Sequence, residues 1–247
     1  AGRMNRYIDI HCHILPGIDD GAHSLEESVA MAKKAVADGV RAVILTPHQK
    51  PDRRCPDRES IRKRTEQLQK VLDGLQIPLK LYPGGEVLYS YDMVRLLEEK
   101  KACALADSRY ILTEFLPDED WSYIYNGIYE LLGAGCRPVI AHTERYANVA
   151  CDLDRVEQLR ESGCLIQING GSLTGFGGSQ IKRTARRLIR EELADFVATD
   201  AHRAGGSRKY AMGECAEWLK RKCSREYAEK LLYRNAERIL KDEEIIR

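Results

Sequence analysis

Seven short apolar segments alternate with longer amphipathic stretches along the chain of 247 residues. The segments are nearly continuous in apolar and β-branched residues, a pattern typical of parallel strands that are buried on both faces. They predict strands at residues 7–10, 40–45, 79–82, 110–113, 137–141, 165–168 and 196–199.

The stretches between these segments predict helices. In the first, Ser24 and Glu27 form a capping box, and apolar residues then repeat at helical spacing until Gly39. Further helices are predicted near 57–73, 91–100, 121–133, 152–162, 179–191 and 207–233. This repeated alternation favours an α/β barrel or a doubly wound sheet, and the length suits a single domain over residues 1–247.

Composition narrows the function classes. The 39 basic and 38 acidic residues nearly cancel, which argues against a nucleic-acid or membrane partner. No apolar run approaches the roughly 20 residues of a membrane span, and the first residues lack the apolar core of a signal peptide, so we expect a cytoplasmic protein. The eight cysteines contain no CxxC pair, which predicts reduced thiols and excludes a zinc finger.

Most histidines and several acidic residues follow directly after a predicted strand. In parallel α/β folds, ligands gather at the carboxyl ends of the strands, so these side chains are expected to meet. Five of the six histidines are among them. In chain order, the candidates are His11, His13, Asp19, Asp20, His48, Glu86, Glu114, His142, Arg145, Asp200 and His202.

Spacing adds a geometric expectation. Residues i and i+2 of an extended segment project to the same side, so His11 with His13, and Asp200 with His202, are expected to bind as pairs. Cys12 then points away, into the core. Imidazoles and carboxylates without thiolate suit Mn, Fe or Zn, and their number exceeds the needs of one ion.

Three polar residues near the candidates stay open at this point. Asp19 is either a ligand or a turn residue that bonds through its side chain. Glu144 either lies behind a ligand or faces solvent. His23, beside the start of the first predicted helix, is expected at the surface.

The motifs DIHCHILPGIDDG, LTPH, GGE, AHTERY and TDAH, in this order and spacing, resemble those of the PHP superfamily of metal-dependent phosphoesterases. The chain is most similar to the bacterial manganese-dependent protein tyrosine phosphatases of the CpsB/CapC capsular polysaccharide family, and the similarity includes NGGSLTG at 169–175 and NAERIL at 235–240. It implies a distorted (β/α)7 TIM-like barrel, the PHP fold.

The resemblance also implies a site for three ions, with manganese the expected metal and iron or zinc as alternatives. It assigns the first ion to His11, His13, Glu86 and Asp200, the second to Glu86, Glu114 and His142, and the third to Asp20, His48 and His202. It thus selects Asp20 over Asp19. Two departures from the family pattern, AHTER and the glutamine of TPHQ, touch no implied ligand.

The implied reaction is phosphotyrosine hydrolysis by a metal-bridging hydroxide, which attacks phosphorus in line. Arg145 is expected to bind the phosphate. Arg208 is either a second phosphate ligand or an ordinary arginine at a helix start. The implied substrate is the phosphotyrosine-containing tail of a bacterial tyrosine kinase that regulates capsular or exopolysaccharide synthesis; the sequence does not predict an oligomeric state.

Four alternative interpretations accompany this prediction. The first, a cysteine phosphatase, would use C-x5-R at Cys103–Arg109 or Cys215–Arg221, although neither motif lies in a glycine-containing loop between a strand and a helix. The second is a PHP phosphoesterase for a small ester such as histidinol phosphate or for a nucleic-acid end, which the neutral net charge disfavours. The third is a metal-binding regulator without activity. The fourth concerns the basic segment 50–64, which either recruits an acidic tail or is a solvated loop. The stretch NGGSLTGFGGS is predicted to form a flexible loop at the barrel rim.

Overall fold

The strands form a curled parallel sheet in the computed structural model, which describes residues 6–50 and 55–247. The strands are β1 (Tyr7–Cys12), β2 (Val40–Leu45), β3 (His48–Gln49), β4 (Lys80–Pro83), β5 (Glu86–Leu88), β6 (Tyr110–Glu114), β7 (Arg137–Ile140), β8 (Leu165–Asn169) and β9 (Phe196–Ala198). Their neighbours follow two runs, β1-β2-β4 and β3-β5-β6-β7-β8-β9, and every pair in these runs is parallel.

The nine strands of the described residues correspond to the seven predicted strands, because two of the predicted strands are each interrupted and form two shorter strands. β3 continues β2, and β5 continues β4, after two intervening residues each. Gly84 and Gly85 form the second break. A Cβ on Gly84 would lie 2.7 Å from Ile44 Cγ2, and a Cβ on Gly85 would clash with Gln49 Oε1. The two glycines therefore let the strand that carries Glu86 approach its neighbour closely.

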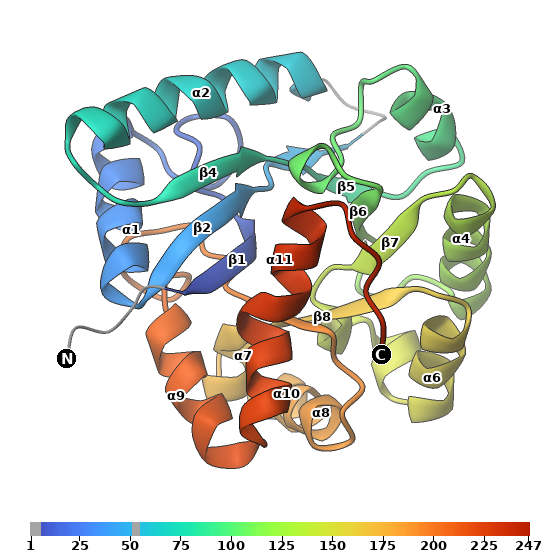
Figure 1. Cartoon of the computed structure of the whole chain (residues 1–247). Coiled ribbons are helices and arrows are strands. Elements are labelled where there is room, and N and C mark those ends of the chain that lie inside the picture. Colours follow the sequence, from blue (N-terminus) through green and yellow to red (C-terminus); the bar gives the residue numbers. More distant parts are fainter. Residues whose placement is uncertain (1–5, 51–54) are drawn as a thin grey trace.

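The barrel closes between β1 and the segment after β9. An isolated parallel bridge joins Cys12 to Ala201. His13 N–H donates to Ala201 O at 2.9 Å, and Asp200 N–H donates to His11 O at 2.8 Å. With helices around the outside of the strands (Figure 1), the predicted distorted (β/α)7 barrel is confirmed.

The first six predicted helices are present, and short helical segments that the pattern did not predict lie between them. The helices are α1 (Leu25–Ala37), α2 (Arg58–Gly74), α3 (Met93–Glu98), α4 (Trp121–Gly133), α5 (Ala147–Ala150), α6 (Leu153–Glu161), α7 (Gly170–Thr174), α8 (Ser179–Arg190), α9 (Met212–Lys222), α10 (Arg225–Glu229), the π-helical turn η3 (Lys230–Arg234) and α11 (Asn235–Leu240), with short 3-10 turns η1 (Leu105–Asp107) and η2 (Thr143–Arg145). Within the described ranges, no helix combines the length and apolar character needed to cross a membrane.

One helix prediction and one loop prediction are wrong. The continuous helix at 207–233 starts only at Met212 and breaks before Ser224, whose Oγ caps a new helix by accepting from Tyr227 N–H at 3.1 Å. The predicted rim loop is partly helical, since Gly170–Thr174 form α7. The pattern could not separate these cases, because capping serines and short glycine-containing turns also occur within apolar periodic stretches.

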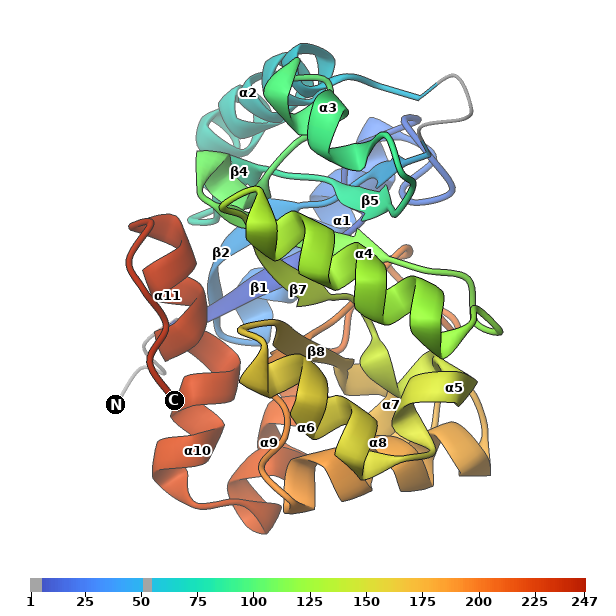
Figure 2. The ribbon, with the colours of Figure 1, turned by 90° about the vertical axis from the view of Figure 1, so that its right-hand side faces the viewer.

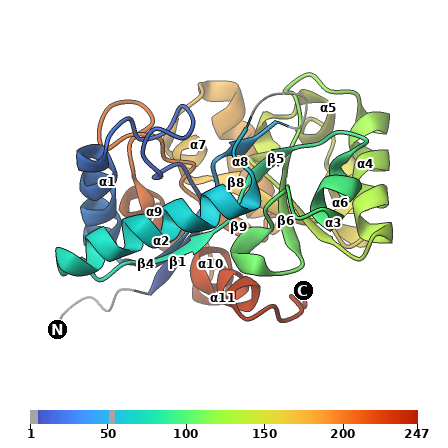
Figure 3. The ribbon, with the colours of Figure 1, turned by 90° about the horizontal axis from the view of Figure 1, so that it is seen from above.

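Two apolar clusters fill the molecule. The inner cluster lies within the barrel and includes Ile8, Ile10 and Val139, while the outer cluster lies between the strands and the surrounding helices. Ala236 and Ile239 of α11 belong to the inner cluster. Figures 2 and 3 show α10 and α11 at the amino ends of the strands, so the carboxyl ends face the opposite side. The half of the barrel at the amino ends of the strands is thus a packed core. The polar candidate residues lie at the carboxyl ends of the strands.

Candidate metal centre

The predicted ligands converge at the carboxyl ends of the strands. Three groups of side chains each bring one nitrogen or oxygen atom per residue to within 4.8 Å of one another. The groups are His11, His13, Glu86 and Asp200; His13, Asp20, His48 and His202; and His48, Glu86 and Glu114.

The first group is fully buried and closely spaced. Nε2 of His11 lies 3.2 Å from Glu86 Oε2 and 3.2 Å from Asp200 Oδ1. Nε2 of His13 lies 3.2 Å and 3.3 Å from the same two oxygens. Two imidazoles and two carboxylates therefore surround one point at the top of the barrel.

An irregularity in β1 turns His11 toward this point. Ile10 belongs to the inner apolar cluster and Cys12 to the outer one, although residues two apart share one side of a regular strand. The register between β1 and β2 shifts between Asp9 and Cys12. Such bulges re-aim side chains next to functional sites, and Cys12 packs in the core as predicted.

Glu86 links the first group to the other predicted ligands. Its Oε2 lies 3.1 Å from His48 Nδ1, and its Oε1 lies 2.9 Å from His142 Nε2. Glu114 completes this side, with 3.7 Å from its Oε1 to His142 Nε2 and 3.5 Å from its Oε2 to His48 Nδ1. The carboxylate of Glu86 thus lies close to four imidazoles, those of His11, His13, His48 and His142.

The remaining group lies nearer the surface. Asp20 Oδ1 is 3.2 Å from His48 Nε2 and 3.3 Å from His202 Nε2. The rings of His13 and His202 are stacked with centroids 3.9 Å apart. His48 therefore faces the Glu86 side with Nδ1 and the Asp20 side with Nε2.

The spacing rule paired Asp200 with His202, and this expectation is wrong in its geometry. Asp200 has a left-handed backbone, with φ of 50°, instead of an extended one. Its carboxylate joins His11 and His13, while His202 joins Asp20. His142 is likewise left-handed, with φ of 33°. Non-glycine residues adopt this conformation at a cost of about 1–3 kcal/mol each, and such strain concentrates at functional sites.

Hydrogen bonds behind the rings fix which nitrogen faces the centre. His11 Nδ1 donates to Gln167 Oε1 at 2.9 Å, and His13 Nδ1 donates to Asp19 Oδ2 at 2.8 Å. His202 Nδ1 donates to Asp200 O at 2.9 Å. In the neutral rings Nε2 therefore carries a lone pair toward the carboxylates, as in histidines that bind metals.

These lone pairs decide whether the residues fit a metal. Two acceptors that face each other repel unless a cation lies between them. In agreement with this, Glu86 Oε2, Glu114 Oε2 and His48 Nδ1 are buried without a hydrogen-bond partner, although ring nitrogens are close by. The donor set of imidazoles and carboxylates, with unpartnered atoms aimed at one centre, fits divalent cations.

The pKa values of the histidines also indicate a centre that attracts cations. Burial disfavours protonated His13, but the nearby carboxylates of Asp19, Asp200 and Glu86 raise its pKa well above the usual value. Burial also disfavours protonated His48, yet the nearby carboxylates of Asp20 and Glu114 raise its pKa to about 10. The carboxylates thus draw positive charge to the centre, which protons satisfy when no metal is bound.

Several residues that support the ligands were missed or left open. Asp19 does shape the turn, because its Oδ1 accepts from Gly21 N–H at 2.8 Å, but it also orients His13. Gln167 accepts from His11 and from His142 N–H at 2.8 Å. The signal for Gln167 was available in the strand LIQIN, where two polar residues alternate within an apolar run.

A polar chain extends from Gln167 to the ligands of the first group. Gln167 Nε2 donates to Asn169 Oδ1 at 2.9 Å, and Asn169 Nδ2 donates to Asp200 Oδ2 at 2.8 Å. Glu144 lies behind this chain, where it accepts from Asn169 N–H and from Ser172 Oγ. Glu144 is buried, so its solvent-facing alternative is wrong. The desolvated position raises its pKa.

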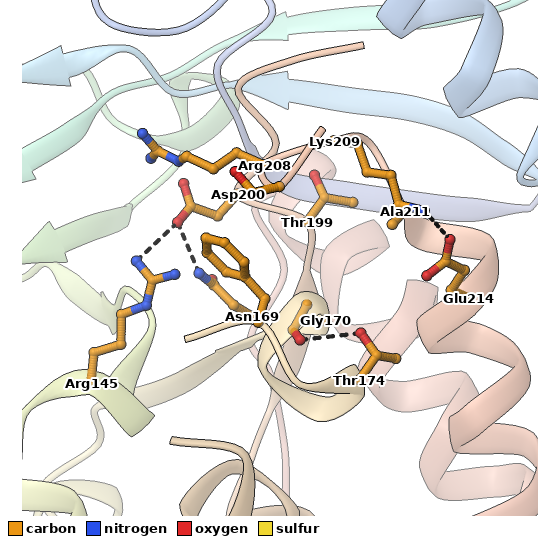
Figure 4. A pocket seen from close by; sticks show the side chains of 13 residues that line it. Arg145, Asn169, Gly170, Thr174, Thr199, Asp200, Arg208, Lys209, Ala211 and Glu214 are labelled. Atoms are coloured by element: carbon orange, nitrogen blue, oxygen red, sulfur yellow. Dashed lines mark hydrogen bonds and ion pairs between the residues drawn. The ribbon is translucent and has the colours of Figure 1, made fainter. Parts of the chain in front are cut away.

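The two candidate arginines border the centre on one side, where they line a cavity of about 130 Å³ (Figure 4). Arg145 Nη1 lies 3.6 Å from Asp200 Oδ2. Arg208 donates to Asp20 Oδ2 at 3.0 Å and to His202 Nε2 at 2.6 Å. Arg208 does not begin a helix, because its carbonyl accepts from His202 N–H in an irregular segment. It holds a positive charge where the resemblance puts an ion.

Other residues near the centre have structural or surface roles. His23 is exposed, as expected. Gln49, the departure from the family pattern, ties loops together by donating to Pro56 O and Lys101 O. In the segment 50–64, residues 51–54 lie outside the described residues, and Arg58 is paired with Asp107 at 2.6 Å.

The cysteine-phosphatase alternative fails on geometry. Cys103 and Cys215 are buried, and burial raises the pKa of both thiols, that of Cys103 to about 12. Cys215 lies within α9 and its Sγ contacts Met212. A nucleophilic thiolate requires the opposite, an exposed group with a lowered pKa.

Comparisons with known proteins agree with the site. The chain is 36% identical to the tyrosine-protein phosphatase YwqE of Bacillus subtilis over 240 residues, 97% of this chain and 94% of that protein. It is 32% identical to the tyrosine-protein phosphatase CpsB of Streptococcus pneumoniae, over 96% of this chain and 99% of that protein. A solved structure from work on these two metal-dependent tyrosine phosphatases superposes with a TM-score of 0.91 at 36% identity, covering 97% and 96%.

The family itself follows from a model match. The model for capsular polysaccharide synthesis proteins CpsB/CapC matches residues 7–241, nearly the whole chain. The resemblance expected from the motifs is thereby confirmed. Matched over this length, and more than 30% identical to curated members, the chain belongs to the CpsB/CapC family.

Proposed function

We propose that this protein is a metal-dependent protein-tyrosine-phosphatase. The observation that carries the proposal is Glu86 Oε2, which lies within 3.2 Å of nitrogens from His11, His13 and His48 yet has no hydrogen-bond partner. A cation at this point would satisfy all four groups. The relatives named tyrosine-protein phosphatases supply the substrate class.

The proposed centre holds three divalent ions, manganese above all. Bound ions would supply a water of lowered pKa and neutralise the oxygens of the phosphoryl group. The proposed ligands are His11, His13, Glu86 and Asp200 for the first, Glu86, Glu114 and His142 for the second, and Asp20, His48 and His202 for the third.

The protein residues would bind and orient the phosphate. Arg145 borders Asp200 from the cavity and can form two hydrogen bonds with phosphoryl oxygens. Arg208 adds a second guanidinium on the same side. Because a tyrosine phenol has a pKa near 10, its oxygen leaves without strong acid assistance, which agrees with a site poor in proton donors.

The proposed physiological substrate is the phosphotyrosine-containing tail of a bacterial tyrosine kinase that controls capsular or exopolysaccharide synthesis, in the cytoplasm. The family description supports the pathway, and the similarity to CpsB and YwqE supports phosphotyrosine. The centre lies at the open end of the barrel, where His48 and Asp20 are partly exposed, so a peptide side chain can reach it.

The test compares substrates on protein that is stripped of metal and reconstituted with Mn²⁺, Fe²⁺ or Zn²⁺. We expect a phosphotyrosine peptide to be preferred over the same peptide with phosphoserine and over histidinol phosphate. Glu86→Gln should lower activity by roughly 100-fold or more, whereas the matched change at the exposed Glu98 should not. A preference for histidinol phosphate would establish the small-ester alternative instead.

A further inference from the structure

The cavity beside the metal centre contains one aromatic ring. It is lined by Arg145 and Arg208, by the ligand Asp200, and by residues of the α7 region and of the segment before α9. Among its lining residues, all in the described part of the chain, Phe176 alone is aromatic. The ring is half-buried, so part of its surface is open to a ligand.

The backbone holds Phe176 in place. Phe176 N–H donates to Gly171 O at 2.8 Å, and its Cβ lies only 3.3 Å from the position that a Cβ on Gly171 would take. The flanking Gly175 and Gly177 have φ of 119° and 87°, a conformation that side chains disfavour. The turn therefore presents this ring at a defined place without help from a rigid secondary-structure element.

The ring and the proposed phosphate ligand lie side by side. Arg145 Cζ is 5.8 Å from the centroid of the Phe176 ring, and Arg145 Nη1 is 3.6 Å from Asp200 Oδ2. The guanidinium of Arg145 thus lies between Asp200, a proposed metal ligand, and the ring of Phe176. In an aryl phosphate a single oxygen separates the ring from phosphorus, so a phosphate held by Arg145 places the aryl ring near Phe176.

We propose that Phe176 is a specificity-determining residue that packs against the aryl ring of the substrate. It would favour aryl over alkyl phosphate esters, a selection that phosphate-binding arginines and ions do not make. This inference rests on the proposed phosphatase function and names the element of the chain that selects phosphotyrosine.

The test uses metal-loaded protein and the variants Phe176→Ala, Phe176→Leu and Phe176→Tyr. Phenylphosphonate and methylphosphonate serve as competitive inhibitors, because they share the phosphonate and differ in the ring. For Phe176→Ala we expect the inhibition constant of phenylphosphonate, and the Michaelis constant for para-nitrophenyl phosphate, to rise roughly 2- to 12-fold, as measured aromatic pairs imply. The constant for methylphosphonate, and kcat, should stay within about twofold of wild type, because neither depends on the ring contact.

Controls separate this role from a structural one. Phe176→Tyr should behave as wild type, and Phe176→Leu, which keeps an apolar side chain at the turn, should still weaken phenylphosphonate. Tyr129→Ala, which removes an exposed aromatic residue on α4, should change neither constant. Equal effects on both phosphonates, or none on either, would overturn the inference. Failure of the wild type to hydrolyse phosphotyrosine peptide would instead refute the proposed function.

Discussion

Replacing Asp19 by asparagine tests whether this residue acts only on the turn or also on the metal. Its Oδ2 accepts from His13 Nδ1 at 2.8 Å and from His48 N–H at 3.0 Å, while Oδ1 accepts from Gly21 N–H. The side chain is 6% exposed, so water does not replace lost bonds. Asparagine keeps one accepting oxygen, and its NH2 group must face at least one of these donors.

Two separate magnitudes follow. Leaving one buried donor unpaired costs about 1–3 kcal/mol of stability, which lowers Tm by roughly 2–12 °C for a chain of this size. Removing the carboxylate behind His13 should also weaken metal binding about 10- to 100-fold, or about 1.4–2.7 kcal/mol. The second effect arises because a charged acceptor makes the opposite ring nitrogen a better ligand.

Calorimetric titration of metal-free protein with Mn²⁺, together with thermal melts, measures both effects. Asp92→Asn, at a carboxylate whose side chain is 66% exposed, provides the matched control and should leave both values unchanged. If Asp19→Asn lowers Tm but binds Mn²⁺ with wild-type affinity, Asp19 only shapes the turn. In that case the hydrogen bond to His13 does not tune the centre.

Three further predictions can be checked on the same protein. Gly21→Ala should destabilise the fold by about 1–3 kcal/mol in thermal melts and reduce bound metal, because its Cβ would clash with His13 O; an unchanged metal content would contradict this. Chelation by EDTA should lower Tm by roughly 5–10 °C, and added Mn²⁺ should restore it. The shift corresponds to about 2.7 kcal/mol, the stability that one metal site contributes when the metal concentration is about 100 times its Kd. Iodoacetamide should leave phosphatase activity intact, since Cys103 and Cys215 are buried thiols of raised pKa; inactivation of metal-loaded protein would reopen a cysteine mechanism.

The sequence predicted which residues meet because parallel strands have a common carboxyl end. His48 and Glu86 are far apart in the chain but pair across β3 and β5, directly after strands that the apolar pattern located. Their meeting follows from the strand ends and from the rule that the ends of parallel strands face one way. Rotamers and strand register do not enter, so the rule could predict which of the candidate histidines and carboxylates meet, although not how each is oriented.

Side-chain direction could not be predicted in the same way, because it depends on contacts between distant segments. The shift in β1 that turns His11 inward is set by pairing with β2, and the left-handed Asp200 is held by its N–H bond to His11 O. The i, i+2 rule assumes extended backbone at both residues. It held for His11 with His13, which lie in one group, and failed for Asp200 with His202, because Asp200 is left-handed. The helix predicted at 207–233 failed for a related reason, since its first residues bond to His202 and Arg203 instead of to one another.

Gln167 shows why orientation and ligand identity are encoded differently. One side-chain oxygen of β8 accepts from His11 Nδ1 and from His142 N–H, and so couples ligands of the proposed first and second ions. A glutamine in an apolar strand is costly to bury unless its polar atoms are paired, and here each has a partner. Asn169 lies in the same strand, but the other two partners come from β1 and from the end of β7, so no local window of sequence contains the whole set. Candidate ligands can be proposed from chemistry and strand ends, but the hydrogen-bond network that orients them exists only in the folded barrel.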